Sequence, residues 1–169
     1  EAPTGSGKTF TSLASALPFV TKKNYKIIYC VRTNSQQKQV IRELKAFAKA
    51  GTKSSVVAIQ GRESMCPQQK NDNELAKSNW SEKSKICKSL KLQSKMGEAG
   101  CPYYRKLLRP TKNLVENWSS KVYSAEEFTE NAEKEGICPY ELNKLLLKEA
   151  QVVIVPVSYT HLRAHETEE

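Results

Sequence analysis

One stretch near the start of the chain, Ala2–Thr9, limits what the rest can fold into. Its sequence, Ala-Pro-Thr-Gly-Ser-Gly-Lys-Thr, fits the phosphate-binding P-loop, in which glycines let backbone N–H groups turn toward the phosphates. Lys8 can reach the β- and γ-phosphates, and the hydroxyl of Thr9 can bind Mg²⁺. Ala2 stands where the pattern has Gly. The residues expected to hold the phosphates and the metal ion are Gly5, Ser6, Gly7, Lys8 and Thr9.

Helical and β-branched apolar stretches alternate after the P-loop and again near the end of the chain. The expected helices cover about 8–17, 34–49 and 139–149, and the expected strands cover 26–31, 55–59 and 152–155. Alternation of this kind predicts an α/β fold with a parallel sheet. Pro18 is expected to end the first helix, and Cys30 is expected to be a buried core thiol within the first strand.

The turn between the first expected strand and the second expected helix is rich in hydroxyl and amide side chains. Thr33 with Gln36, or Asn34 with Gln37, fits a helix-capping box. The same turn offers N–H groups, hydroxyls and the guanidinium of Arg32 to a nucleic-acid phosphate. Both interpretations stay open from the residues alone, and the candidate nucleic-acid contacts are Arg32, Thr33 and Asn34.

Residues 61–139 differ from the segments on either side, because they are polar and rich in Lys, Ser, Glu and Asn. We expect them to be an insertion between two parts of one sheet domain, which comprises residues 1–60 and 140–156. The final segment, 157–169, fits neither a helix nor a strand, so we expect a non-native tail without function.

Four of the five cysteines lie in this insertion, at Cys66, Cys87, Cys101 and Cys138. A polar segment of this size with little apolar content needs a cross-link to be stable, and a metal bound by four thiolates can supply one. Their wide spacing differs from the close pairs of zinc ribbons and suits an iron–sulfur cluster equally well or better. Three of the four precede proline, which stiffens the backbone beside the sulfur. A cluster, a zinc ion and four free thiols all stay open at this point.

The insertion also carries many lysines and arginines with interleaved tyrosines, and the chain has a net charge of +9. Such a surface suits a polyanion, and aromatic rings can stack on the bases of single-stranded nucleic acid. No apolar run reaches the length of a membrane span, and the start does not resemble a secretory leader. We therefore expect an internal fragment of a longer cytoplasmic protein, or of a nuclear one if the source is eukaryotic.

Together these motifs resemble the XPD family of superfamily-two DNA helicases, with the archaeal branch nearest. The resemblance covers about residues 1–156. It rests on the P-loop, the run Ile-Tyr-Cys-Val-Arg-Thr-Asn-Ser-Gln-Gln, the four spaced cysteines, and Ile-Cys-Pro-Tyr before a Leu-rich helix. It implies a partial RecA-like motor domain with an inserted, mostly helical iron–sulfur domain. Ala in the first P-loop position is usual in this family, so Ala2 is no longer an exception.

The resemblance implies an ATP-dependent enzyme that uses Mg²⁺ and moves 5′ to 3′ on single-stranded DNA. It implies that the four insertion cysteines bind a 4Fe–4S cluster in a domain that forms part of the DNA gate, and that Arg62 supports this cluster. Arg62 is also expected to contact nucleic acid, and Arg32–Ser35 is expected to touch single-stranded DNA. Members of the family act on fork DNA in nucleotide excision repair and, in eukaryotes, together with transcription-factor subunits.

The family's second acidic motif and second motor domain are not found in this sequence, and its only aspartate, Asp72, lies in a polar stretch. The chain alone is therefore expected to be inactive as an ATPase, because it lacks the carboxylate that holds Mg²⁺. Two other interpretations are a zinc-stapled nucleic-acid-binding module without ATPase activity and a different P-loop enzyme such as a kinase. A bacterial damage-inducible helicase is a closer competitor, although the cysteines of that group are spaced differently.

Overall fold

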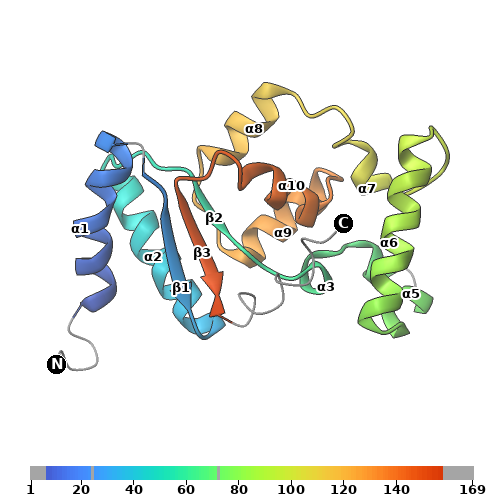
Figure 1. Cartoon of the computed structure of the whole chain (residues 1–169), viewed down its shortest axis with the longest axis horizontal. Helices are drawn as coiled ribbons and strands as arrows, with labels where there is room; N and C mark the ends of the chain where they lie inside the picture. Colours follow the sequence, from blue (N-terminus) through green and yellow to red (C-terminus); the bar gives the residue numbers. More distant parts are fainter. Residues whose placement is uncertain (1–6, 24, 72, 158–169) are drawn as a thin grey trace.

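A small parallel sheet forms the centre of the α/β part of the molecule (Figure 1). The computed structural model describes residues 7–23, 25–71 and 73–157. The strands are β1 (Ile27–Val31), β2 (Val56–Ala58) and β3 (Val152–Pro156). Their order is β1-β3-β2, so β3 pairs with both of the other strands. The expected α/β fold with a parallel sheet is confirmed.

Two long helices, α1 (Lys8–Lys23) and α2 (Asn34–Lys49), cover one face of this sheet (Figure 1). Helix α1 continues past Pro18, so the expected end of the helix at this residue is wrong. Proline removes one backbone hydrogen bond from a helix interior. The buried side chains of Leu17 and Val20, on either side of Pro18, compensate by anchoring the helix.

The start of α2 is fixed by Thr33, whose side chain accepts a hydrogen bond from the N–H of Gln36. The side chain of Gln36 in turn accepts a hydrogen bond from the N–H of Arg32, across 2.8 Å. Of the two expected capping pairs, the one between Thr33 and Gln36 therefore forms. Gly51 follows the helix with a φ of 96°, a conformation that ends helices and favours glycine.

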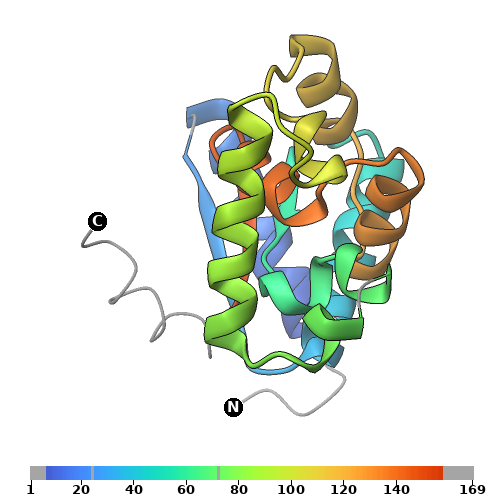
Figure 2. The same ribbon diagram turned by 90° about the vertical axis from the view of Figure 1, so that its right-hand side faces the viewer.

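The segment between β2 and β3, called the insert below, is mostly helical within the described residues. Its helices are α3 (Arg62–Met65), α4 (Gln68–Asn71), α5 (Asn73–Lys77), α6 (Trp80–Lys95), α7 (Pro102–Arg105), α8 (Lys112–Ser119), α9 (Ala125–Lys134) and α10 (Pro139–Leu146). Helix α10 leads back to β3, and α6 stands at the end of the molecule opposite α1 (Figures 1 and 2). None of the described helices is long and apolar enough to cross a membrane.

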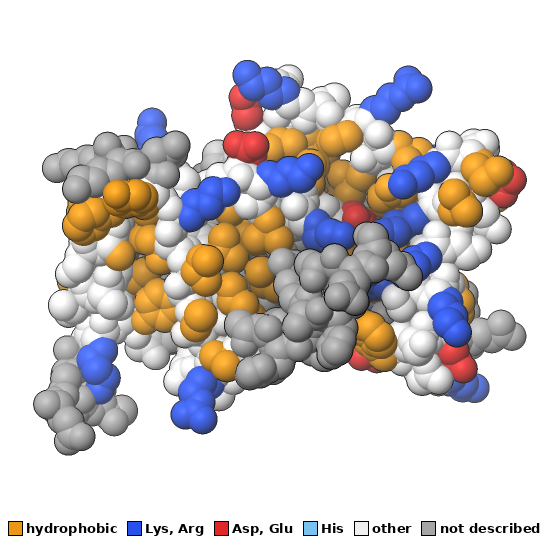
Figure 3. All heavy atoms as spheres, viewed as in Figure 1, with side chains coloured by type: hydrophobic (Ala, Val, Ile, Leu, Met, Phe, Trp, Pro, Cys, Tyr) orange, Lys and Arg blue, Asp and Glu red, His pale blue; other side chains and the backbone are white. Residues whose placement is uncertain are grey.

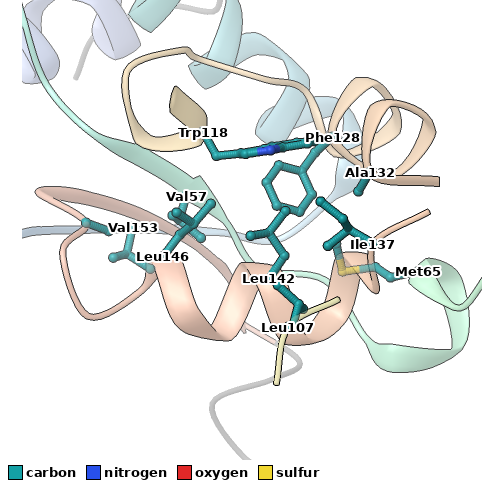
Figure 4. Packing of buried hydrophobic residues seen from close by; sticks show 11 residues of the cluster. Val57, Met65, Leu107, Trp118, Phe128, Ala132, Ile137, Leu142, Leu146 and Val153 are labelled. Atoms are coloured by element: carbon teal, nitrogen blue, oxygen red, sulfur yellow. The ribbon is translucent and has the colours of Figure 1, made fainter. Parts of the chain in front are cut away.

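The helices of the insert share an apolar core with the second face of the sheet, to which Val57 of β2 and Val153 of β3 contribute (Figure 4). Trp118 packs edge-on against Phe128 with ring centroids 5.1 Å apart, and both rings lie beside Leu142 of α10. The polar composition of residues 61–139 therefore did not predict that their apolar side chains form part of a core. Its apolar side chains are spread over several short helices, so no single stretch of sequence is markedly apolar.

One face of β1 stays open to solvent, because β1 is an edge strand and the insert core covers β2 and β3. Ile28 is 68% exposed, and Cys30 is also exposed. Cys30 is therefore not the buried core thiol that the apolar run predicts. Figure 3 shows apolar side chains on this face of the sheet, bordered by lysines and arginines.

Candidate functional site

The described part of the P-loop starts at Gly7, whose φ of 74° lies in the left-handed region that favours glycine. Gly5 and Ser6 lie outside the described residues. Lys8 and Thr9 form the first turn of α1. The carbonyl of Gly7 accepts hydrogen bonds from the N–H and the hydroxyl of Thr11, at 2.9 and 3.1 Å. The helix therefore begins directly at the glycine, as a phosphate site at a helix N-terminus requires.

The N-terminus of α1 lies at the edge of the sheet where the parallel strands end (Figure 1). Arg32, Thr33 and Asn34 follow β1 at this edge, and all three are exposed. The hydroxyl of Ser12 lies 3.4 Å from that of Tyr29, which ties α1 to β1. Open α/β sheets bind their ligands at the carboxyl ends of the strands. The start of α1, where the nucleotide is expected, and the turn Arg32–Asn34, where nucleic acid is expected, therefore lie at the same end of the sheet.

The four insert cysteines reach one cavity from four separate segments, and we call this the cysteine cavity. Cys66 follows α3, Cys87 lies within α6, Cys101 precedes α7 and Cys138 precedes α10. Three tyrosines and two cationic side chains line the same cavity. Residues up to 72 positions apart in the sequence therefore meet at one place, as the spacing of the cysteines alone could not show.

Burial raises the pKa of three of these thiols, and it raises the pKa of Cys138 to about 12. Hydrogen bonds from the backbone of Gln68 and Gln69 act in the opposite direction on the pKa of Cys66. The backbone of Glu141 does the same for Cys138. Burial therefore favours the protonated form of these three thiols in the metal-free chain, while the backbone donors beside Cys66 and Cys138 favour the thiolate form that binds metal.

Arg62 contributes a cation to the cavity wall, and its charge lowers the pKa of Cys87 although burial has the larger, opposite effect. Its Nη1 donates a hydrogen bond to Ser84 across 2.9 Å, and its guanidinium lies 4.9 Å from the ring centroid of Tyr140. Its Nε is buried and has no hydrogen-bond partner among the described residues. Buried donors without a partner are costly, so an anionic acceptor in the cavity fits this arrangement.

The candidate residues divide between two places in the molecule (Figures 1 and 2). The described end of the P-loop, Gly7–Thr9, and the turn Arg32–Asn34 lie at the carboxyl ends of the strands, whereas the cysteines and Arg62 lie in the insert. The guanidinium of Arg62 faces the cysteines, which fits a supporting role in that cavity. A direct contact of Arg62 with DNA stays a prediction.

Gly100 is a residue of this site that sequence reasoning missed. A Cβ atom at this position would lie 2.1 Å from the carbonyl oxygen of Leu90 and 2.5 Å from the backbone nitrogen of Ser94. The next residue, Cys101, donates its N–H to the same carbonyl of Leu90 across 3.2 Å. Cys101 can lie this close to α6 only because position 100 has no side chain. The signal in the sequence was a glycine directly before a cysteine.

Within the described residues, no group of three or more His, Cys, Asp or Glu side chains is arranged to hold a metal ion. A tetrahedral zinc site with Zn–S bonds of about 2.3 Å brings its thiolates to roughly 3.8 Å from one another. A four-iron cluster is larger and holds its four cysteines farther apart. Four thiols around one cavity, with two cations and without a carboxylate in the wall, fit a larger anionic group of this kind.

Comparison with known proteins gives a family for this chain. The DEAD_2 family model matches residues 29–166. Regulator of telomere elongation helicase 1 of Mus spretus is 29% identical over 136 residues, which cover 79% of this chain and 10% of that protein. The homolog from Caenorhabditis briggsae is 26% identical over 191 residues, which cover 94% of this chain and 18% of that protein.

The chain thus spans less than one fifth of the length of these relatives. These relatives are eukaryotic, and the expected likeness to the archaeal branch stays a prediction. The family model covers both the turn that follows β1, Arg32–Asn34, and the whole insert with its four cysteines. The chain therefore belongs to the DEAD_2 family of superfamily-two helicases.

Proposed function

We propose that this chain is part of an ATP-dependent DNA helicase whose insert holds a 4Fe–4S cluster through Cys66, Cys87, Cys101 and Cys138. The observation that carries the proposal is the convergence of these four cysteines on one cavity. When bound, such a cluster supplies a rigid cross-link among four chain segments and a centre that can take up one electron. Burial opposes the thiolate form of Cys87, and the charges of Arg62 and Lys91 favour it.

ATP and Mg²⁺ are assigned to the P-loop. The residues are Gly5, Ser6, Gly7, Lys8 and Thr9. In support, α1 starts at Lys8, directly after Gly7, so the N-terminal end of the helix lies at the expected phosphate site. Lys8 is placed in the first turn, where its ammonium can reach the β- and γ-phosphates, and Thr9 can offer its hydroxyl to Mg²⁺.

DNA is assigned to the neighbouring turn and to the basic surface. Arg32, Thr33 and Asn34 are exposed and lie at the same end of the sheet as the expected nucleotide site. The net charge of +9 favours binding to a polyanion. The finer assignments are 5′-to-3′ unwinding of fork DNA, a role in nucleotide excision repair, repair or transcription-factor subunits as partners, and a cytoplasmic or nuclear location.

The test is to purify the 169-residue chain without air and to measure its iron, acid-labile sulfide and zinc. About four irons and four sulfides per folded chain are expected. One zinc without sulfide contradicts the cluster and favours the zinc-stapled nucleic-acid-binding module instead. Cys101→Ser should lose the iron, whereas Cys30→Ser, on the exposed strand face, is the matched control and should keep it.

Helicase function is tested in the full-length parent protein. Lys8→Ala should abolish ATP hydrolysis and leave the iron content unchanged. Cys101→Ser should abolish unwinding while much of the ATP hydrolysis remains, and unwinding by this variant would contradict a role of the insert in strand separation. The 169-residue chain alone should release no phosphate from ATP in the presence of single-stranded DNA.

A further inference from the structure

Two lysines flank Cys87 on the same face of α6, because Lys83 and Lys91 lie four residues before and after it. Each lysine is paired with a glutamate that stands three residues from another cysteine of the cavity. Lys83 lies 2.9 Å from Glu63, and Lys91 lies 2.7 Å from Glu141. Neither ion pair has a role in the proposed function so far.

The pair on the Lys91 side is the more enclosed of the two. The side chains of Lys91 and Glu141 are 21% and 14% exposed, whereas that of Glu63 is 59% exposed. Lys91 lines the cysteine cavity, and its Nζ lies 5.6 Å from the ring centroid of Tyr104. Charges with little exposure are weakly screened by salt, so removing either member of the pair leaves the other charge to act on the cavity with little screening.

Both members of the pair lie close to cysteines of the cavity. Lys91 lies one helical turn after Cys87 on α6 and lines the cavity. Glu141 lies in the first turn of α10, three residues after Cys138, and its carboxylate is 2.7 Å from the Lys91 ammonium. A cation beside the cavity favours negative charge within it and an anion opposes it, so Lys91 and Glu141 act in opposite directions.

We propose that Lys91 and Glu141 are positioning residues that set the reduction potential of the metal group in the cysteine cavity, in opposite directions. The inference rests on the proposed function, because it requires the four-iron cluster. Reduction by a one-electron donor adds one negative charge to the cavity and breaks no bond. Lys91 stabilises the reduced form, and Glu141 destabilises it and holds the Lys91 ammonium in place.

The test is a redox titration of the 169-residue chain with dithionite and mediators, followed by the paramagnetic signal of the reduced cluster. Glu141→Gln should raise the ratio of reduced to oxidised cluster about tenfold at a fixed potential, or about 59 mV for one electron. Lys91→Met, which keeps the aliphatic stem, should shift the ratio in the opposite direction by a similar factor. The double variant should return close to the unaltered chain. Lys85→Met, an exposed lysine on the same helix, is the charge-matched control and should change nothing.

The outcomes separate the two proposals. A chain without iron and sulfide overturns the proposed function and this inference together. A loaded cluster whose potential is the same in all variants, or which shifts in one direction in both single variants, overturns this inference alone. If Lys91→Met fails to load iron, the result for Glu141→Gln decides, because the amide keeps the shape of the carboxylate.

Discussion

The buried side-chain amide of Asn143, on α10, donates a hydrogen bond to the backbone carbonyl of Ala58, the last residue of β2, across 3.0 Å. The two residues are 85 positions apart, and the contact joins the end of the insert to its beginning. We expect Asn143→Ala to lower the free energy of unfolding by about 1–3 kcal/mol, because the carbonyl is left buried without a partner. Urea unfolding measures this effect. Asn117→Ala, on the exposed surface of α8, is the control and should change it by less than about 0.5 kcal/mol.

Replacement of Gly100 should displace Cys101 from the cavity. In Gly100→Ala the new Cβ meets backbone atoms of α6, which cannot yield as a flexible side chain can. We expect the free energy of unfolding to fall by about 1–3 kcal/mol and the iron content after reconstitution to drop. Gly97→Ala is the matched control, because Gly97 has a φ of 84° but no atom within 4 Å of the added Cβ. It should cost about 1–2 kcal/mol of stability and keep its iron. Equal iron loss in both variants would contradict the close approach as the cause.

The P-loop can be tested in the 169-residue chain without any ATP hydrolysis. Lys8→Ala should weaken binding of Mg²⁺–ATP at least about tenfold, since a charge-assisted contact with phosphate contributes about 1.5–3 kcal/mol. Isothermal titration calorimetry measures the affinity, and iron analysis should show no difference. Lys49→Ala, an exposed lysine at the end of α2, has the same change in charge and should bind normally. Equal affinities of the unaltered chain, Lys8→Ala and Lys49→Ala for Mg²⁺–ATP would contradict nucleotide binding at this site.

The stability of the metal-free chain should fall at alkaline pH. The pKa of Cys138 is raised from 9.0 to about 12 by burial, so the unfolded chain loses this proton at a lower pH than the folded chain does. The stabilising contribution is complete below about pH 9 and is lost as the pH rises toward 12. For this one group the slope approaches about 1.4 kcal/mol per pH unit. The measurement is urea unfolding of the unaltered chain and of Cys138→Ala between pH 8 and 11, and identical slopes would contradict the assignment.

Much of the sheet could be predicted from sequence because its signals are local. Three apolar β-branched runs and the amphipathic pattern of α2 gave the strands and the helix within a few residues. The predicted end of α1 at Pro18 was wrong, because the packing of Leu17 and Val20 outweighs the local effect of this proline. The exposure of Cys30 depends on strand order, which an apolar run does not encode.

The candidate site was predictable in its cysteines but not in its surroundings. The thiols stand out by residue type, whereas Lys91 and Glu141 resemble any other surface charges until the fold brings them together from 50 positions apart. Gly100 reads as a loop glycine, because a close approach of two backbones leaves no periodic pattern. The P-loop and the nucleic-acid turn are predicted from their residue patterns, whereas the common position of Gly7–Thr9 and Arg32–Asn34 at the carboxyl ends of the strands follows from the parallel topology.

The insert leaves the sheet after β2 and returns at the start of β3, and these two strands are neighbours. They run parallel, with Val56 opposite Val152 and Ala58 opposite Ile154, so the exit and the return lie at opposite ends of the same ladder. Tension between the two ends of the insert therefore draws the strands past each other along their length. In mechanical terms the ladder is loaded in shear, and its hydrogen bonds bear the force together rather than one after another.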